Sequence, residues 1–155
     1  MSKRKFLNII FIIYIVLLIV FVVIKLDFNY TFLHVRNSIK LNREFGFWNI
    51  NLYPFKTTLS YIRRVKKSSI SIMYVIEHLA GNVIAFLPMG FFIPLLTRHK
   101  LLYSMLICLG IIVLIEVIQF VFMIGYADVD DIILNMLGCF AGYGLYRIFM
   151  NKGIC

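Results

Sequence analysis

Acidic residues are scarce in this chain of 155 residues, which holds seven Asp and Glu against sixteen Lys and Arg. The three cysteines show none of the paired spacings of a zinc site or a disulfide framework. The sequence also contains no HExxH, GxSxG, P-loop or GxGxxG motif. These absences exclude the common metalloprotease, hydrolase and nucleotide-binding signatures, so no catalytic template can be assigned.

Apolar residues make up 62% of the chain, and the mean hydropathy is +0.93. Soluble domains are closer to half apolar, and a membrane-spanning helix needs about 20 mostly apolar residues. We therefore predict an all-α integral membrane protein, a bundle of four transmembrane helices that forms one domain over residues 1–155. The predicted spans are residues 6–24, 74–96, 101–123 and 132–150. A soluble ligand-binding module and nucleic-acid binding are excluded, because no soluble region remains to carry them despite the net charge of +9.

The first span follows the basic stretch Ser2–Lys5, as the apolar part of a signal peptide would. The run is as long as a bilayer crossing and no small-residue cleavage site follows, so we predict an uncleaved helix. Lys and Arg in the short segments beside membrane spans are enriched on the cytoplasmic side. Applied to this chain, this rule places both termini in the cytoplasm. A count of all cations favours the opposite orientation, because the long loop after the first span is basic. The cations placed in the cytoplasm are Lys3, Arg4, Lys5, Arg98, Lys100, Arg147 and Lys152.

The loop of residues 25–73 is rich in cations and aromatic rings. Nine Lys and Arg and two acids lie within residues 25–71, interleaved with rings such as Trp48 and Tyr53. This composition suits the membrane–water interface, so we predict an extracytoplasmic amphipathic loop held by lipid headgroups. Pro54 predicts a re-entrant or interfacial turn. The cations expected to support the site are Arg63, Arg64, Lys66 and Lys67.

Three of the seven acids, Asp128, Asp130 and Asp131, lie in the short link between the last two spans. We predict that this link is exposed to water. Two interpretations stay open: the acids cap the following helix, for which one acid suffices, or they bind a ligand. Spacings of four, three and four residues define one stripe of that helix. The stripe consists of Asp131, Asn135, Gly138 and Gly142, and its glycines allow a second helix to approach closely.

Polar side chains also lie inside the second and third spans. Glu116 and Gln119 are three residues apart and share one helical face, and Asn82 lies early in the second span. The second helix begins where the third ends and the fourth begins, so all these residues lie on the same membrane side as the acids. We expect Asn135 to face Glu116 and Gln119 across the glycine contact. Interhelical hydrogen bonding without any ligand is the alternative.

Pro88 and Gly90 predict a structural kink in the second span, where a neighbouring group must satisfy the freed carbonyl. Carboxylates from several helices have the oxygen chemistry of a divalent-cation site. No spacing in the sequence fixes such a geometry, so no metal and no cofactor are predicted.

Four segments, in sequence order, carry a family resemblance: Asn51–Phe55, Asn82 with Phe86–Phe91, Glu116–Gln119, and Asp128–Gly138 with Gly142 and Tyr143. Together they resemble the VanZ-like family of teicoplanin-resistance membrane proteins. Many members have a Gly-Arg pair just before the acidic segment, where this chain has Ile124-Gly125-Tyr126, so a cation would have to come from the basic loop. The resemblance implies low-level resistance to glycopeptide or lipoglycopeptide antibiotics through an effect at the cell surface.

We therefore predict a bacterial multi-pass protein of the cell membrane that contributes to teicoplanin-type resistance by binding a cell-wall precursor lipid or the antibiotic. Its candidate ligand-binding residues are Asn82, Glu116, Gln119, Asp128, Asp130, Asp131 and Asn135. Its packing residues are Pro88, Gly90, Gly138 and Gly142. The alternatives are a carboxylate- or metal-dependent intramembrane enzyme acting on a lipid-linked envelope substrate, and a helix-packing subunit of an envelope complex. Membrane lipids and a second copy of the chain are further candidate partners.

Overall fold

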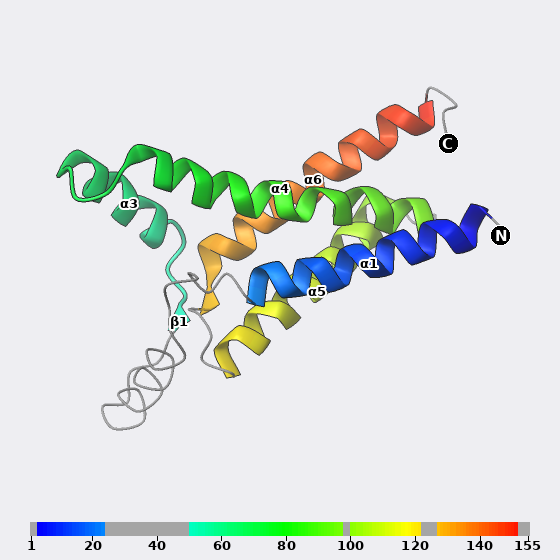
Figure 1. The fold of residues 1–155 in the computed structure, drawn as a ribbon, viewed down its shortest axis with the longest axis horizontal. Helices are drawn as coiled ribbons and strands as arrows, with labels where there is room; N and C mark the ends of the chain where they lie inside the picture. Colours follow the sequence, from blue (N-terminus) through cyan, green and yellow to red (C-terminus); the bar gives the residue numbers. More distant parts are fainter. Residues whose placement is uncertain (1–2, 24–49, 98–99, 122–126, 152–155) are drawn as a thin grey trace.

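The computed structural model describes residues 3–23, 50–97, 100–121 and 127–151 (Figure 1). Helices dominate these residues. The elements, in chain order, are α1 (Lys3–Val23), β1 (Ile50–Asn51), α3 (Lys56–Lys66), α4 (Ile72–Thr97), α5 (Leu101–Val121), β2 (Ala127–Asp128) and α6 (Val129–Asn151). Residues 25–49 of the predicted interfacial loop and the basic residues Arg98 and His99 lie outside the described part of the chain.

Three described helices, α4, α5 and α6, are long and apolar enough to cross a membrane, with 26, 21 and 23 residues. They coincide with the predicted spans to within a few residues at each end. The largest difference is at the start of α6, which begins at Val129, three residues before the predicted start of that span. Helix α1 has 21 residues and covers residues 6–23 of the predicted first span, whose last residue lies outside the described part of the chain.

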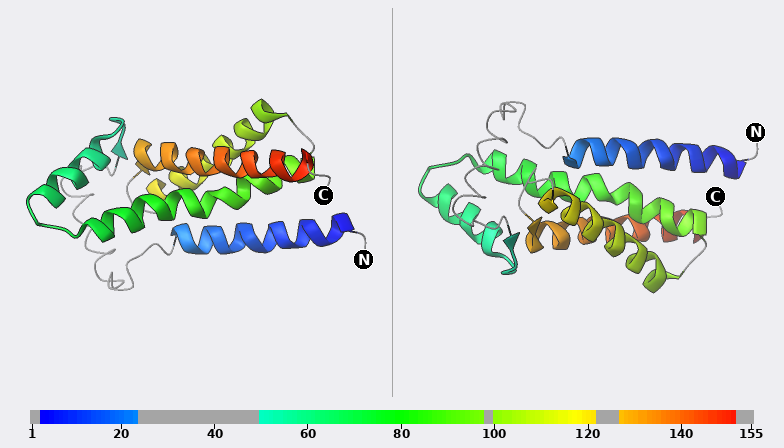
Figure 2. Two further views of the ribbon diagram at one scale, coloured as in Figure 1. Left: turned by 90° about the horizontal axis from the view of Figure 1, so that it is seen from above. Right: turned by 90° about the horizontal axis from the view of Figure 1, so that it is seen from below.

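Helices α4 and α6 share the most extensive helix–helix interface (Figure 2). Glycines make this contact backbone to backbone. A Cβ added at Gly138 would lie 2.2 Å from the Val83 carbonyl oxygen, and one at Gly142 would lie 1.9 Å from that of Leu87. Gly90 makes the reciprocal contact, since its Cβ would lie 2.0 Å from the Cys139 oxygen. The glycine pair therefore contacts α4, and the expectation that it faces α5 is wrong.

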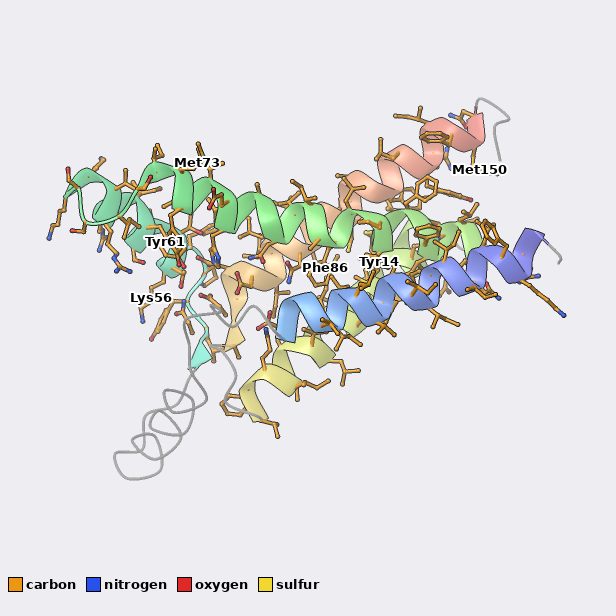
Figure 3. All side chains as sticks on the ribbon, viewed as in Figure 1. Tyr14, Lys56, Tyr61, Met73, Phe86 and Met150 are labelled. Atoms are coloured by element: carbon orange, nitrogen blue, oxygen red, sulfur yellow. The ribbon has the colours of Figure 1, made fainter. Side chains whose placement is uncertain are left out.

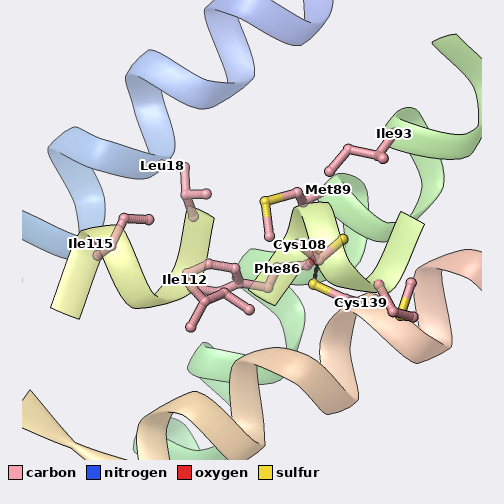
Figure 4. Packing of buried hydrophobic residues seen from close by; sticks show 9 residues of the cluster. Leu18, Phe86, Met89, Ile93, Cys108, Ile112, Ile115 and Cys139 are labelled. Atoms are coloured by element: carbon pink, nitrogen blue, oxygen red, sulfur yellow. Dashed lines mark hydrogen bonds between the residues drawn. The ribbon is translucent and has the colours of Figure 1, made fainter. Parts of the chain in front are cut away.

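Buried apolar side chains from α1, α4, α5 and α6 form one core (Figure 4). Phe86 and Met89 of α4 lie at its centre, with exposed fractions of 1% and 0%. The other members are Leu18, Ile93, Met105, Cys108, Ile112, Ile115 and Cys139. Many apolar side chains outside this core are exposed, as expected where lipid rather than water surrounds a helix.

Helix α4 stays continuous through Pro88 and Pro94. Proline lacks the N–H that would bond the carbonyl four residues earlier, which for Pro88 is that of Ile84. Neighbouring helices supply donors to the next two carbonyls. The Tyr14 hydroxyl of α1 donates to the Ala85 oxygen at 2.7 Å, and the Cys139 thiol of α6 donates to the Phe86 oxygen at 3.7 Å. These two bonds are not to the Ile84 carbonyl, so the expectation that a neighbouring group satisfies the freed carbonyl stays a prediction.

A short parallel pairing of β1 with β2 joins two segments distant in sequence. Ile50 pairs with Ala127, and Asn51 pairs with Asp128. The prediction of a purely α-helical chain omitted this pairing, because two-residue strands leave no periodic pattern. Helix α3 lies at this end of the bundle, whereas the first residue of α1 and the last of α6 lie at the other end (Figures 1 and 2).

The substitution Gly142→Ala tests the α4–α6 contact. Its Cβ would meet main-chain oxygen that cannot rotate away, so we expect a destabilisation of about 1–3 kcal/mol, measured by unfolding in detergent micelles. The matched control is Gly144→Ala, because a Cβ there has no neighbour within 4 Å. The control should be neutral, or more stable by up to about 1 kcal/mol from helix propensity. Equal effects of the two substitutions would contradict the packing described.

Candidate functional site

Asp128 lies at the junction of three elements and is only 6% exposed. Its carboxylate accepts hydrogen bonds from Asn51 Nδ2 at 3.1 Å and from the Thr57 hydroxyl. It also accepts from the backbone N–H of Asp130 at 3.0 Å, which caps the start of α6. Its own N–H donates to Glu116 Oε2 of α5 at 3.4 Å. Helix capping and binding to other elements are thus combined in this one acid.

Asp130 holds the start of α3. This carboxylate, 3% exposed, accepts hydrogen bonds from the backbone N–H groups of Phe55 and Thr58, the latter at 2.9 Å. The Thr58 hydroxyl donates to it as well, at 3.0 Å. Phe55 precedes α3 with a φ of 63° and provides no side-chain cap of its own. Asp130 therefore serves as the anion at the N-terminus of α3, where free N–H groups and the helix dipole favour negative charge.

Asp131 turns toward α4 instead. Its Oδ1 accepts a hydrogen bond from Asn82 Nδ2 at 2.7 Å and lies 3.9 Å from His78 Nε2. The Tyr61 ring of α3 packs edge-on against His78, with 5.2 Å between ring centres (Figure 3 labels Tyr61). Burial raises the pKa of Tyr61 to about 12, so its hydroxyl is neutral at physiological pH. Asp131 and its partners thus join α6, α4 and α3.

We call these residues the polar cluster. Its members are Asn51, Thr57, Thr58, His78, Asn82, Glu116, Asp128, Asp130 and Asp131. They come from the start of α4, the end of α5, the start of α6 and the segment before and within α3. The prediction that Asn82, Glu116 and the acids lie at one end of the bundle is confirmed by these contacts.

Asn135 and Gln119 lie further along their helices. Asn135 is 2% exposed, and its stripe neighbours Asp131 and Gly138 both contact α4. The glycine contact belongs to α4 and not to α5, so that part of the expectation is wrong, and the facing of Asn135 and Glu116 stays a prediction. Gln119 is half-buried, one turn beyond Glu116 on α5.

Asp128 and Asp130 are buried, contrary to the prediction that the acids of the link are exposed to water, whereas the Asp131 side chain is 25% exposed. The sequence analysis also did not identify the groups that donate hydrogen bonds to the buried carboxylates of Asp128 and Asp130. These donors are Asn51, Thr57, Thr58 and the Phe55 N–H. The segment Asn51–Phe55 predicts a turn and carries part of the family resemblance, but its sequence does not show which carboxylates its donors meet. A pattern of polar residues cannot reveal which distant donors meet a given carboxylate.

The remaining predicted residues lie away from the polar cluster. Arg63, Arg64 and Lys66 are exposed on the C-terminal half of α3 and Lys67 directly follows it, while the cluster contacts its first turn. Gly90, Gly138 and Gly142 belong to α4–α6 packing, and Pro88 lies in the interior of α4. Within residues 3–23, 50–97, 100–121 and 127–151, no three His, Cys, Asp or Glu side chains are arranged to hold a metal ion.

The site is rich in hydrogen-bond acceptors. Two buried side-chain oxygens, Asn51 Oδ1 and Asn135 Oδ1, accept no hydrogen bond in the described structure. The Asn51 amide orientation is fixed, because its Nδ2 donates to both Asp128 and Thr57. A buried oxygen without a donor is costly, so this end of the bundle is suited to groups that donate hydrogen bonds or carry positive charge.

A family model and a curated protein both match this chain, and both are VanZ proteins. The model of the VanZ/LLP1 family matches residues 11–150. Protein VanZ of Enterococcus faecium is 30% identical over 143 residues, which cover 90% of this chain and 74% of that protein. No solved structure matches the chain.

The substitution Asp130→Ala tests the attachment of α3. Removing the carboxylate leaves three donors of the first turn unpaired, a loss of about 1–3 kcal/mol. We expect hydrogen exchange of the amides of residues 56–66 to accelerate by about tenfold or more, measured by mass spectrometry in lipid nanodiscs. The control Glu77→Ala removes an exposed acid at the same end and should leave this exchange unchanged. Unchanged exchange in Asp130→Ala would show that α3 is held by other contacts.

Proposed function

Because this chain belongs to the VanZ/LLP1 family, we propose that it lowers the susceptibility of a bacterial cell to teicoplanin-type glycopeptide antibiotics. In this proposal the polar cluster, with Asn135 and Gln119 beside it, binds a cell-wall precursor lipid or the antibiotic itself. The observation that supports it is the convergence of Asn82, Glu116 and Asp131 from three helices at one end of the bundle. Buried polar side chains in membrane helices are costly to maintain, which favours a functional role for them.

The proposed arrangement in the membrane has four spans, α1, α4, α5 and α6, in a single domain. Both termini face the cytoplasm, and the polar cluster and α3 face outward. The position of the first residue of α1 and the last of α6 at one end, opposite α3, supports this arrangement (Figure 2). The exposed cations of α3 would attract anionic headgroups or pyrophosphate at the outer surface.

Two observations set this proposal above its alternatives. The carboxylates of Asp128 and Asp130 are engaged in holding α3 and capping α6, so they are not free acid–base groups for an enzyme. The glycines Gly138 and Gly142 contact α4 of the same chain, so the stripe offers no vacant face to a helix of another subunit.

Neutral variants of the cluster test the proposed binding. The double substitution Glu116→Gln and Asp131→Asn keeps the size of both side chains and removes their charge. At matched expression, we expect the drug susceptibility of the host to rise to that of cells carrying an empty vector. Glu77→Gln, the exposed neighbour of His78, is the control and should behave as the wild-type protein. Wild-type susceptibility in the double variant would refute this mechanism.

Reporter fusions test the orientation. Alkaline phosphatase is active only outside the cytoplasm, so fusions after residues 60 and 128 should be active. A fusion after residue 100, in the short basic segment between α4 and α5, should be inactive and serves as the control. The reverse pattern would place the polar cluster in the cytoplasm and remove it from the cell surface.

A further inference from the structure

Helix α3 has an inner face that is bound to the polar cluster. The two threonines of its first turn donate hydrogen bonds to Asp128 and Asp130. Tyr61, one turn further on, packs against His78 of α4. These contacts hold one side of α3 on the buried acids. No residue of α3 is itself buried, so the helix covers the cluster while its other side stays exposed.

The outer face of α3 combines apolar side chains with cations. Leu59, Ile62 and Lys66 are spaced by three and four residues, so they share one stripe of the helix. The leucine is 48% exposed and the isoleucine 45%. Residues 52–76 hold five Lys and Arg and no acid. These cations, all exposed, are Lys56, Arg63, Arg64, Lys66 and Lys67.

The position of α3 brings this outer face to the membrane surface. Helices α4, α5 and α6 are long and apolar enough to cross a membrane, and α3 lies obliquely across the end of the bundle where α4 and α6 begin (Figures 1 and 2). A helix with an apolar stripe and flanking cations lies in the plane of the interface, with its apolar side chains among the lipids and its cations at the headgroups. The residue Tyr53, before α3, is 73% exposed, and the Lys56 ammonium lies 5.5 Å from its ring centre. Tyrosine is enriched at the same level of the bilayer.

The spread of the cations favours a charged surface over a single soluble phosphate. Lys56 and Lys67 lie at opposite ends of α3, roughly 16 Å apart at 1.5 Å per helical residue. One phosphate cannot contact both, whereas a bilayer presents a separate headgroup to each. The surface also offers hydrocarbon to Leu59 and Ile62, which a soluble anion does not. Charge and apolar exposure therefore indicate the same partner, an anionic lipid surface.

We propose that α3 docks through its outer face on the anionic phospholipid headgroups of the surrounding bilayer, and that this docking holds its inner face over the buried acids of the polar cluster. Asp130 and the lipid surface then hold the same helix from opposite faces. This inference rests on the proposed function, because it names a lipid partner that regulates the same site. The anionic lipid content of the bilayer determines how firmly the cluster is covered.

Spin labelling of the full chain in nanodiscs tests the docking. A nitroxide on Leu59→Cys reports the outer face, in a Cys155→Ser background, since Cys108 and Cys139 are buried. The nanodiscs contain either phosphatidylcholine alone or phosphatidylcholine mixed with phosphatidylglycerol. We expect an uncharged nickel chelate in the water to reach the label at least about fivefold less with phosphatidylglycerol, because the cations bind its headgroups. Equal accessibility in the two lipids would overturn the proposal.

Matched charge variants identify the cations responsible. The first variant neutralises the cations at the end of α3: Arg63→Gln, Arg64→Gln, Lys66→Gln and Lys67→Gln. The control neutralises four exposed cations at the opposite end of the bundle: Arg4→Gln, Lys5→Gln, Lys100→Gln and Arg147→Gln. With phosphatidylglycerol present, the first variant should show the accessibility seen in phosphatidylcholine alone, and the control should behave as the wild-type protein. Equal effects of both variants would reflect net charge in general and contradict docking by α3.

Inorganic phosphate added to the phosphatidylcholine nanodiscs tests the other source of this chemistry. We expect it to leave the label accessible, because it provides no surface for the apolar stripe. Protection by phosphate equal to that by phosphatidylglycerol would overturn the assignment to lipid. The comparison of lipids uses the same protein throughout, so it does not depend on the folding of the charge variants.

The two proposals fail separately. If the label is protected by phosphatidylglycerol but the double variant of Glu116 and Asp131 leaves drug susceptibility at the wild-type level, the lipid docking stands and the resistance mechanism fails. If susceptibility changes but the label stays accessible in both lipids, the function stands and the docking of α3 on anionic lipid is wrong.

Discussion

The carboxylate of Asp130 at the N-terminus of α3 is the contact on which this end of the molecule depends. It joins residues 75 positions apart in the chain, and the acid is buried. A buried charge is stable only when its hydrogen bonds are satisfied, and here two backbone N–H groups and a hydroxyl satisfy it. Because α3 has no buried residue of its own, its position follows from this anchor and from the neighbouring contacts of Asp128.

The anchor in turn depends on close packing deeper in the bundle. Gly138 and Gly142 let α6 lie directly on the main chain of α4, which fixes the rotation of α6 about its axis. That rotation directs Asp131, on the same stripe, to Asn82 of α4. It leaves Asp130, one residue earlier, directed to α3. A change of helix spacing at the glycines would therefore be transmitted to the acids.

The helices could be predicted from the sequence because the apolar runs are long enough to cross a membrane. The gathering of polar residues at one end could be predicted because successive spans run in opposite directions. The stripe of Asp131, Asn135, Gly138 and Gly142 could also be predicted, since helical periodicity shows which residues share a face. Periodicity does not identify the neighbour of that face, so the glycines were assigned to the wrong helix. The burial of Asp128 and Asp130 escaped prediction for a related reason. A sequence shows the charge but not the donors, such as Thr57 and Thr58, that come to it from a distant segment.

The hydrogen bonds already made by Asp128 and Asp130 determine what a ligand at this end of the bundle would have to displace. Asp128 and Asp130 have their oxygens occupied by Asn51, the two threonines and backbone N–H groups, so a ligand that competed for them would have to release α3. Asn135 is different, because its buried oxygen accepts no hydrogen bond within the described structure. Binding that uses Asn135 leaves the anchor intact, whereas binding that uses Asp130 must move α3. The acids that hold α3 and the unpaired amide oxygen of Asn135 are therefore distinct groups, although they lie within two turns of the same helix.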